Sequence, residues 1–223
     1  MYSPPVDAPP RPQDQRTALR SAGVLTVCSV LLLTLVAVRW HPLTGLDEDI
    51  ATTTHRWAVD ESGLTQAFRI LTDWVWDPWT MRLLCTVVAL WLMWRRQAWW
   101  TALWLGVTCL LGTLLQQGLK AAVDRPRPVW PDPVDSARYA AYPSGHAMTA
   151  TVVCGLLLWL LHHYGADRRV FRTVLAVCVF SVVGVGLTRI WLGVHWASDV
   201  VGGWLLGMLV VAVAVLVHGR RGT

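Results

Sequence analysis

The chain has 223 residues, of which 54% are hydrophobic and only 15% are charged. Soluble globular domains are about 25% charged, so this composition excludes an ordinary soluble protein and indicates a single domain embedded in a membrane. The net charge of +5 arises from side chains near the ends of apolar segments rather than along one basic face, which argues against nucleic-acid binding.

Six apolar segments follow one another along the chain. They comprise Ala22–Val38, Pro78–Trp94, Ala98–Leu119, Gly145–Leu161, Val174–Leu187 and Val200–Val217. About 20 helical residues cross the ~30 Å hydrocarbon core of a bilayer, and the segments approach or reach this length once the fifth is extended to Leu192. The sequence therefore predicts an all-α integral membrane protein, with a bundle of six transmembrane helices over residues 21–218.

The first apolar segment could also be a secretory signal, because Arg11, Arg16 and Arg20 precede it. Bulky residues follow at Arg39–Pro42, where a signal peptidase requires small ones, so we expect an uncleaved helix. Residues 1–20 are rich in Pro, Arg and Asp, which predicts a disordered N-terminus. A short tail is expected at residues 219–223.

Two long connections separate the apolar segments. The first, at about 40–77, places residues such as Trp57, Leu64 and Phe68 at roughly helical spacing, which predicts one or two amphipathic helices in the membrane interface. The second, at about 120–144, contains several prolines, which stiffen it and preclude regular helix.

Basic residues are unevenly divided between the two sides that this topology defines. With the N-terminus in the cytoplasm, the cytoplasmic segments contain ten basic and three acidic residues, whereas the opposite side contains nine and eleven. Positive charge favours the cytoplasmic side. Both termini are therefore predicted to be cytoplasmic, with the two long connections on the outer face of the cell membrane.

Three cationic side chains, those of Lys120, Arg127 and Arg189, stand near predicted outer helix ends. Taken singly, each matches an interface residue whose charged end reaches toward water. Together they suit a phosphate group, because guanidinium forks and an ammonium group bind phosphate oxygens. Ser144 and Gly145 precede the fourth apolar segment, where a hydroxyl, a close backbone approach and a helix N-terminus favour an anion, although Pro-Ser-Gly alone is typical of an ordinary turn.

Two histidines accompany these cations. His146 follows Gly145 and could protonate a leaving alkoxide as a general acid. His195 and Asp199 are four residues apart, which on a helix places both on one face. A carboxylate that accepts from Nδ1 would leave Nε2 free to attack phosphorus. The pair could also cap a helix or bind a metal ion, but no third ligand has matching spacing, so we expect no metal ion or other cofactor.

Three motifs resemble the signature of the type 2 phosphatidic acid phosphatase family, in its membrane-bound lipid phosphate phosphatase branch. They read Lys120-x6-Arg127-Pro128, Pro143-Ser144-Gly145-His146 and Arg189-x5-His195-x3-Asp199. The family usually has Ser before the arginine of the third motif, where this chain has Thr188 and keeps a hydroxyl. Arg125 lies in the variable part of the first motif and is expected to make at most an additional contact.

The resemblance implies a role for each matched residue. His195 would form a phosphohistidine, Asp199 would orient it, and His146 would protonate the leaving group and then activate water. The phosphate oxygens would be held by Lys120, Arg127, Ser144, Gly145 and Arg189. Such enzymes work without a metal ion.

The implied function is that of a phosphatase acting on a lipid in the bilayer. Its substrate would be a prenyl diphosphate such as undecaprenyl diphosphate, phosphatidic acid or phosphatidylglycerophosphate. A lipid phosphotransferase would use the same phosphohistidine with an acceptor hydroxyl in place of water. A non-enzymatic anion transporter is less favoured because no charged residue lies at mid-span, and a haloperoxidase because those relatives are soluble.

Overall fold

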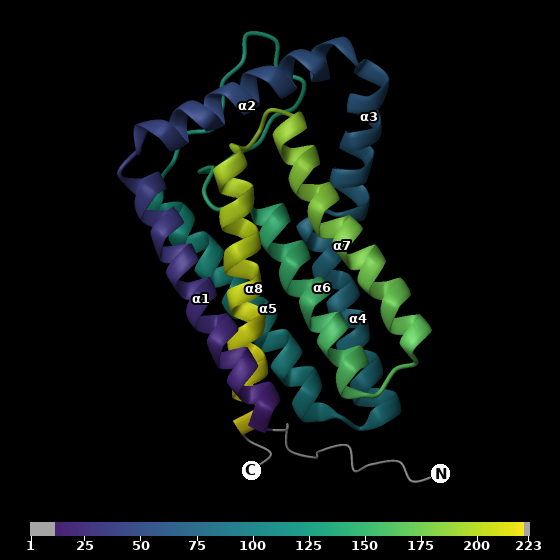
Figure 1. Ribbon diagram of the computed structural model, residues 1–223. Coiled ribbons are helices and arrows are strands. Elements are labelled where there is room, and N and C mark those ends of the chain that lie inside the picture. The colour runs from purple at the N-terminus through teal and green to yellow at the C-terminus, as the bar shows by residue number, and fades with distance from the viewer. Residues whose placement is uncertain (1–11, 221–223) are drawn as a thin grey trace.

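The computed structural model describes residues 12–220, with side chains described from 19 to 219, and its regular secondary structure is helical (Figure 1). The helices are α1 (Pro12–Ala37), α2 (His41–Asp60), α3 (Ser62–Ile70), the short π-helix η1 (Leu71–Val75), α4 (Pro78–Arg96), α5 (Trp99–Val123), α6 (Gly145–His163), α7 (Arg168–Trp191) and α8 (Ala197–Arg220). The predicted all-α class is confirmed.

Five helices of the described chain are long and apolar enough to cross a membrane, namely α1, α5, α6, α7 and α8. Five of the six expected spans are therefore supported. Helix α4, which contains the second predicted span, packs against α5 and α6 in the bundle (Figure 1). Arg82 near its start and Arg95 and Arg96 at its end lower its mean hydropathy below that of the other five.

The predicted disorder of residues 1–20 does not hold where the structure describes them. Helix α1 begins at Pro12, so residues 12–20 are helical. Proline is favoured in the first turn of a helix, and the Gln, Arg, Ala and Leu residues that follow are good helix formers. Residues 1–11 and 221–223 lie outside the described part, and Gly219 and Arg220 of the expected tail belong to α8.

The first long connection folds into α2, α3 and η1, as the prediction of helices at 40–77 required. Helix α2 lies across one end of the bundle (Figure 1). Its buried residues are Asp47, Ala51, His55 and Ala58, at intervals of three or four, so one face of α2 packs on the bundle. Helix α2 thereby covers one end of the bundle. The second long connection, which spans residues 124–144 in the structure, lies at the same end.

Helix α6 is the centre of the bundle, because it packs against α4, α5, α7 and α8. Its contact with α8 is close at Gly203 and Gly207, where an added Cβ would lie 2.8 Å from the Ser144 carbonyl oxygen and 2.7 Å from the Thr151 Cβ, respectively. Small residues spaced four apart let two helix backbones approach closely. The N-terminal ends of α6 and α8 are thus held side by side, and the Ser144 amide donates to the Asp199 carbonyl at 3.0 Å.

Candidate active site

A cavity of about 480 Å³ opens at the end of the bundle that α2 crosses. The C-terminal ends of α5 and α7, the N-terminal end of α6, the turn before α8 and the 124–144 loop contribute to it. Six of the eight residues singled out in the sequence line this cavity: Lys120, Arg127, Gly145, His146, Arg189 and His195. The other two, Ser144 and Asp199, are fully buried beside it. The structure therefore brings the three motifs together.

His195 and Asp199 are in contact, with Nδ1 3.4 Å from Oδ2. The spacing of the two residues predicted that both lie on one helix, but α8 begins at Ala197, so His195 lies in the turn before it. The Asp199 carboxylate reaches back to accept from the Trp196 amide at 2.9 Å, as an acidic residue at the third helical position does in a capping box. The imidazole of His195 is therefore positioned by the capped start of α8 and not by sharing a helix face with Asp199.

The other ring nitrogen of His195, Nε2, lies 3.0 Å from Nη1 of Arg127. With Nδ1 protonated toward Asp199, Nε2 accepts from the guanidinium and the ring is neutral. Burial, followed by the positive charges of Arg127 and Arg189, lowers the pKa of His195 well below its ordinary value of 6.5. The imidazole therefore remains neutral at neutral pH, with an unprotonated nitrogen at the cavity.

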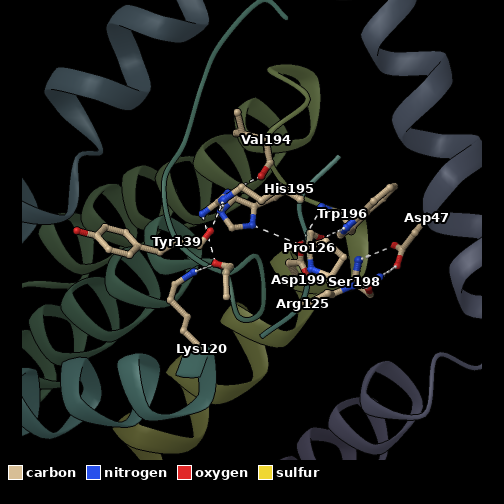
Figure 2. Close-up of polar contacts among 12 residues, drawn as sticks. Asp47, Lys120, Arg125, Pro126, Tyr139, Val194, His195, Trp196, Ser198 and Asp199 are labelled. Carbon is tan, nitrogen blue, oxygen red and sulfur yellow. Dashed lines mark hydrogen bonds and ion pairs between the residues drawn. The ribbon is translucent and has the colours of Figure 1, made fainter. Parts of the chain in front are cut away.

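Backbone carbonyls hold two of the three cations. Lys120 donates to the Ala140 carbonyl, and Arg127 donates to the carbonyls of Tyr139 at 2.8 Å and Val194 at 2.5 Å (Figure 2). Burial and the charge of Arg189 lower the pKa of Arg127 to about 10, so its guanidinium is still charged at neutral pH. Neutral carbonyls orient these groups without cancelling their charge, which leaves them able to bind an anion.

Arg189 is the most enclosed of the three cations, with 4% of its side chain exposed. Its Nη1 lies 3.6 Å from a carboxylate oxygen of Asp135 in the 124–144 loop. Its Nε has no hydrogen-bond partner among the described residues. A buried, incompletely paired guanidinium at the cavity wall has donors available for phosphate oxygens.

The N-terminal end of α6 forms another wall of the cavity. Ser144 is its N-cap, and the buried Ser144 hydroxyl has no hydrogen-bond partner in the described part of the chain. A Cβ on Gly145 would lie 2.7 Å from the side-chain amide nitrogen of Gln116 on α5, so a larger residue there would displace that side chain. His146 in the first turn lines the cavity, as does His195.

The 124–144 loop is anchored on both sides of the cavity. The Trp130 ring stacks on His55 of α2 at 4.1 Å, and its Nε1 donates to the Gly193 carbonyl at 2.9 Å. His55 Nε2 also lies 3.1 Å from Asp132. Gly193 has a positive φ of 66°, and any Cβ there would lie 2.6 Å from Trp130 Nε1. The loop and the turn that carries His195 are therefore positioned as one unit.

The model of the PAP2 superfamily matches residues 101–223, which is more than half of the chain and includes all eight site residues. The chain belongs to the PAP2 superfamily. The resemblance seen in the three motifs is thus confirmed at the level of the family, and PAP2 phosphatases are metal-independent.

Two relatives of this PAP2 chain illustrate the match. Phosphatidylglycerophosphatase B of Bacillus subtilis (strain 168) is 35% identical over 111 residues, which cover 48% of this chain and 54% of the relative. The chain thus matches about half the length of that protein. The crystal structure of a transmembrane PAP2 type phosphatidylglycerolphosphate phosphatase from Bacillus subtilis superposes with a TM-score of 0.75 and 23% identity, over 87% of this chain and 94% of that one. The fold is therefore that of a multi-pass PAP2 membrane protein.

Several further residues lie at or beside the PAP2 site and were not predicted as site residues from the sequence, where Arg125 was expected to make at most an additional contact. Asp73, Asp77 and Asp135 line the cavity, and burial, followed by the charge of Asp135, raises the pKa of Asp73. Asp47 of α2 and Arg125 form ion pairs beside Asp199. The four aspartates fall outside the three motifs and Arg125 is not one of their matched residues, so only the fold brings these side chains near the site.

Proposed function

We propose that this PAP2 protein is a membrane lipid phosphate phosphatase that works through a phosphohistidine. The observation that carries the proposal is the arrangement around one cavity of a neutral His195 Nε2, a second imidazole on His146, and three cationic side chains. A phosphate group placed among the cations would meet a nucleophile and an acid without any further group being required.

In the first step, Nε2 of His195 attacks phosphorus while Lys120, Arg127 and Arg189 neutralise the phosphoryl oxygens. The bond from phosphorus to the leaving oxygen breaks, and this oxygen takes its proton from His146. Asp199 accepts from Nδ1 and stabilises the positive charge that develops on the ring of His195.

In the second step, His146 takes a proton from a water molecule, and the resulting hydroxide attacks the phosphohistidine. The phosphorus–nitrogen bond breaks, inorganic phosphate leaves, and both histidines return to their starting states. Removal of His146 should therefore slow both steps, whereas removal of His195 should prevent the intermediate from forming.

The substrate would be a lipid whose phosphate lies at the headgroup level. Phosphatidylglycerophosphate is supported by the names of both relatives. Phosphatidic acid and prenyl diphosphates such as undecaprenyl diphosphate offer the same terminal phosphate to the three cations. A lipid phosphotransferase would share the first step and pass the phosphoryl group to an acceptor hydroxyl, so release of inorganic phosphate without an acceptor separates the two activities.

The deciding experiment measures inorganic phosphate release by the purified protein in detergent, with phosphatidylglycerophosphate, phosphatidic acid and undecaprenyl diphosphate. Wild-type protein should release phosphate and His195→Ala should not, and quenching in alkali should trap a phosphoenzyme, labile to acid, only in the wild type. His162→Ala is the matched control, because His162 is exposed at the opposite end of α6. Turnover by His195→Ala at the wild-type rate would contradict the proposal.

We also propose that α4 is a sixth span and that the cavity faces the outside of the cell. Helix α4 runs along α5 and α6 (Figure 1) and exposes apolar residues such as Leu83, Val87 and Leu90. The tryptophans Trp79 and Trp94 lie near its two ends, as interface residues do. An alkaline phosphatase reporter, which is active only when exported, should be active when fused after residue 77 and inactive when fused after residue 97. Equal reporter activity at both positions would exclude the crossing.

A further inference from the structure

Arg125 lies directly beside the His195–Asp199 pair but does not line the cavity that the pair serves. Its Nη1 donates to Oδ1 of Asp199 at 2.7 Å and to the Ser198 hydroxyl at 2.7 Å (Figure 2). Its guanidinium also lies 5.6 Å from the ring centroid of Trp196. Arg125 therefore contacts the start of α8 rather than the proposed phosphate position.

The Asp199 carboxylate is held at both oxygens. Oδ1 receives the Arg125 guanidinium, while Oδ2 receives the Trp196 amide and faces Nδ1 of His195. Asp199 is fully buried, and a buried carboxylate needs a paired cation to remain ionised. Arg125 supplies this cation and fixes the rotation of the carboxylate that presents Oδ2 to His195.

Asp47 of α2 holds Arg125 from the side opposite Asp199. Its Oδ2 accepts from Arg125 Nη2 at 2.7 Å and from the Ser198 hydroxyl at 2.5 Å, and its Oδ1 accepts from the Ser198 amide at 2.9 Å. The side chain of Asp47 is 3% exposed and that of Arg125 is 11% exposed. A guanidinium that donates from different nitrogens to two buried carboxylates is directional in a way that a lysine ammonium is not.

We propose that Arg125, clamped by Asp47, is a positioning residue that keeps Asp199 ionised and turned toward Nδ1 of His195. This inference rests on the proposed phosphohistidine chemistry, because only a nucleophilic His195 needs Asp199 to fix its tautomer. Without Arg125 the carboxylate would lose its charge partner at Oδ1 and could rotate or take up a proton. The fraction of His195 with a free Nε2 would then fall, whereas the three cations that bind phosphate would be unchanged.

The signature of such a residue is a loss of rate without a loss of binding. Replacing the outer partner of a metal-bound histidine typically costs about 10–100-fold, and we take this as the order of magnitude for the partner of Asp199. We expect Arg125→Gln to lower kcat by roughly 30-fold, with KM and the affinity for orthovanadate, a phosphate analogue, changed less than about threefold. Arg125→Lys should recover only part of the rate, and Asp47→Asn should show a smaller loss of the same kind. Arg39→Gln is the matched control, because Arg39 is an exposed arginine that lines a neighbouring cavity together with Arg125.

A double-mutant cycle tests whether Arg125 acts through Asp199. If it does, adding Arg125→Gln to Asp199→Asn should cost less than about threefold beyond Asp199→Asn alone, because the carboxylate to be oriented is already absent. A full additive loss, or a weakened affinity for orthovanadate in Arg125→Gln, would mean that Arg125 contacts the substrate and would overturn the inference. A wild-type kcat in Arg125→Gln with a lowered Tm would overturn it as well, since the ion pairs would then serve folding alone.

These outcomes are distinct from failure of the proposed function. Loss of the phosphoenzyme in His195→Ala together with wild-type kcat in Arg125→Gln would reject the positioning role and leave the phosphatase proposal intact. Wild-type turnover in His195→Ala would reject both. If Arg125→Gln does not accumulate as folded protein, the same measurements on Asp47→Asn and Arg125→Lys decide the question, and unchanged kcat in both would reject the inference.

Discussion

Replacing Gly203 with alanine should reduce activity, although Gly203 lies on α8 outside the cavity. The added Cβ would lie 2.8 Å from the Ser144 carbonyl oxygen, 3.1 Å from the Ala147 Cβ and 3.1 Å from the Met148 amide nitrogen. The first and third of these are backbone atoms, so no flexible side chain can move aside. Relief of the contact requires α8 and the N-terminal end of α6 to separate.

The size of the effect follows from these distances. A shift of about 0.6 Å would bring the shortest contact from 2.8 Å to the 3.4 Å at which ordinary van der Waals contact begins. The shift would fall on Gly145 and His146, which begin α6, relative to Asp199 on α8. Overpacking of this kind costs about 1–3 kcal/mol of folding free energy. Because a misplacement of about 1 Å can cost on the order of 100-fold in rate, we expect kcat to fall roughly tenfold.

The assay compares kcat for phosphate release and Tm in the same detergent for wild type, Gly203→Ala and Gly106→Ala. Gly106 is the matched control, because an added Cβ there meets nothing within 4 Å. Alanine in a helix interior is favoured over glycine by about 0.5–1 kcal/mol, so the control should keep its activity and unfold at the same or a higher temperature. If Gly203→Ala matched Gly106→Ala in both measurements, the close packing of α6 and α8 would not be what holds the site together.

Three further predictions test the chemistry. EDTA should leave phosphate release unchanged, since the described residues contain no group of three or more metal-binding side chains, and strong inhibition would instead indicate a metal-dependent reaction. His146→Ala should slow hydrolysis of a phosphomonoester more than that of a diphosphate, because phosphate leaves without the proton that an alkoxide needs, and equal losses would argue against the acid role. Because the pKa of His195 is lowered in the folded state, the imidazole stays neutral below pH 6.5, where an unfolded histidine takes up a proton. The acidic limb of kcat/KM, corrected for the substrate's own titration by ³¹P NMR, should therefore lie below pH 6.5, and a limb at or above that value would contradict the assignment.

The helices were predictable because long uncharged segments have few alternatives to a membrane-spanning helix. The start of α1 was not predictable, because Pro12–Arg20 contains few apolar residues and has a composition typical of disorder. Helix α4 is long enough to cross a membrane, but Arg82 and its tryptophans lower its hydropathy, so its crossing remains a proposal.

The site was predictable to the extent that its residues lie in spaced motifs. Lys120, His146 and His195 could be expected to converge because each stands near a predicted helix end on the same side. The contacts of the Arg125 side chain could not be predicted. Its partner Asp47 lies 78 residues away, on a helix whose placement depends on the whole bundle. His195 lies before α8 rather than within it because the Asp199 carboxylate caps the helix at the Trp196 amide, and the sequence did not reveal where this cap would form.

The contact between Arg189 and Asp135 bears on how firmly the cavity can retain an anion. Asp135 reaches into the cavity from the 124–144 loop, so an arriving phosphate group shares this guanidinium with a carboxylate that already faces it. Net affinity is then the difference between two ion pairs rather than the full strength of one. In the proposed phosphatase, an internal counter-ion of this sort would limit product inhibition, because the same carboxylate would favour the departure of inorganic phosphate.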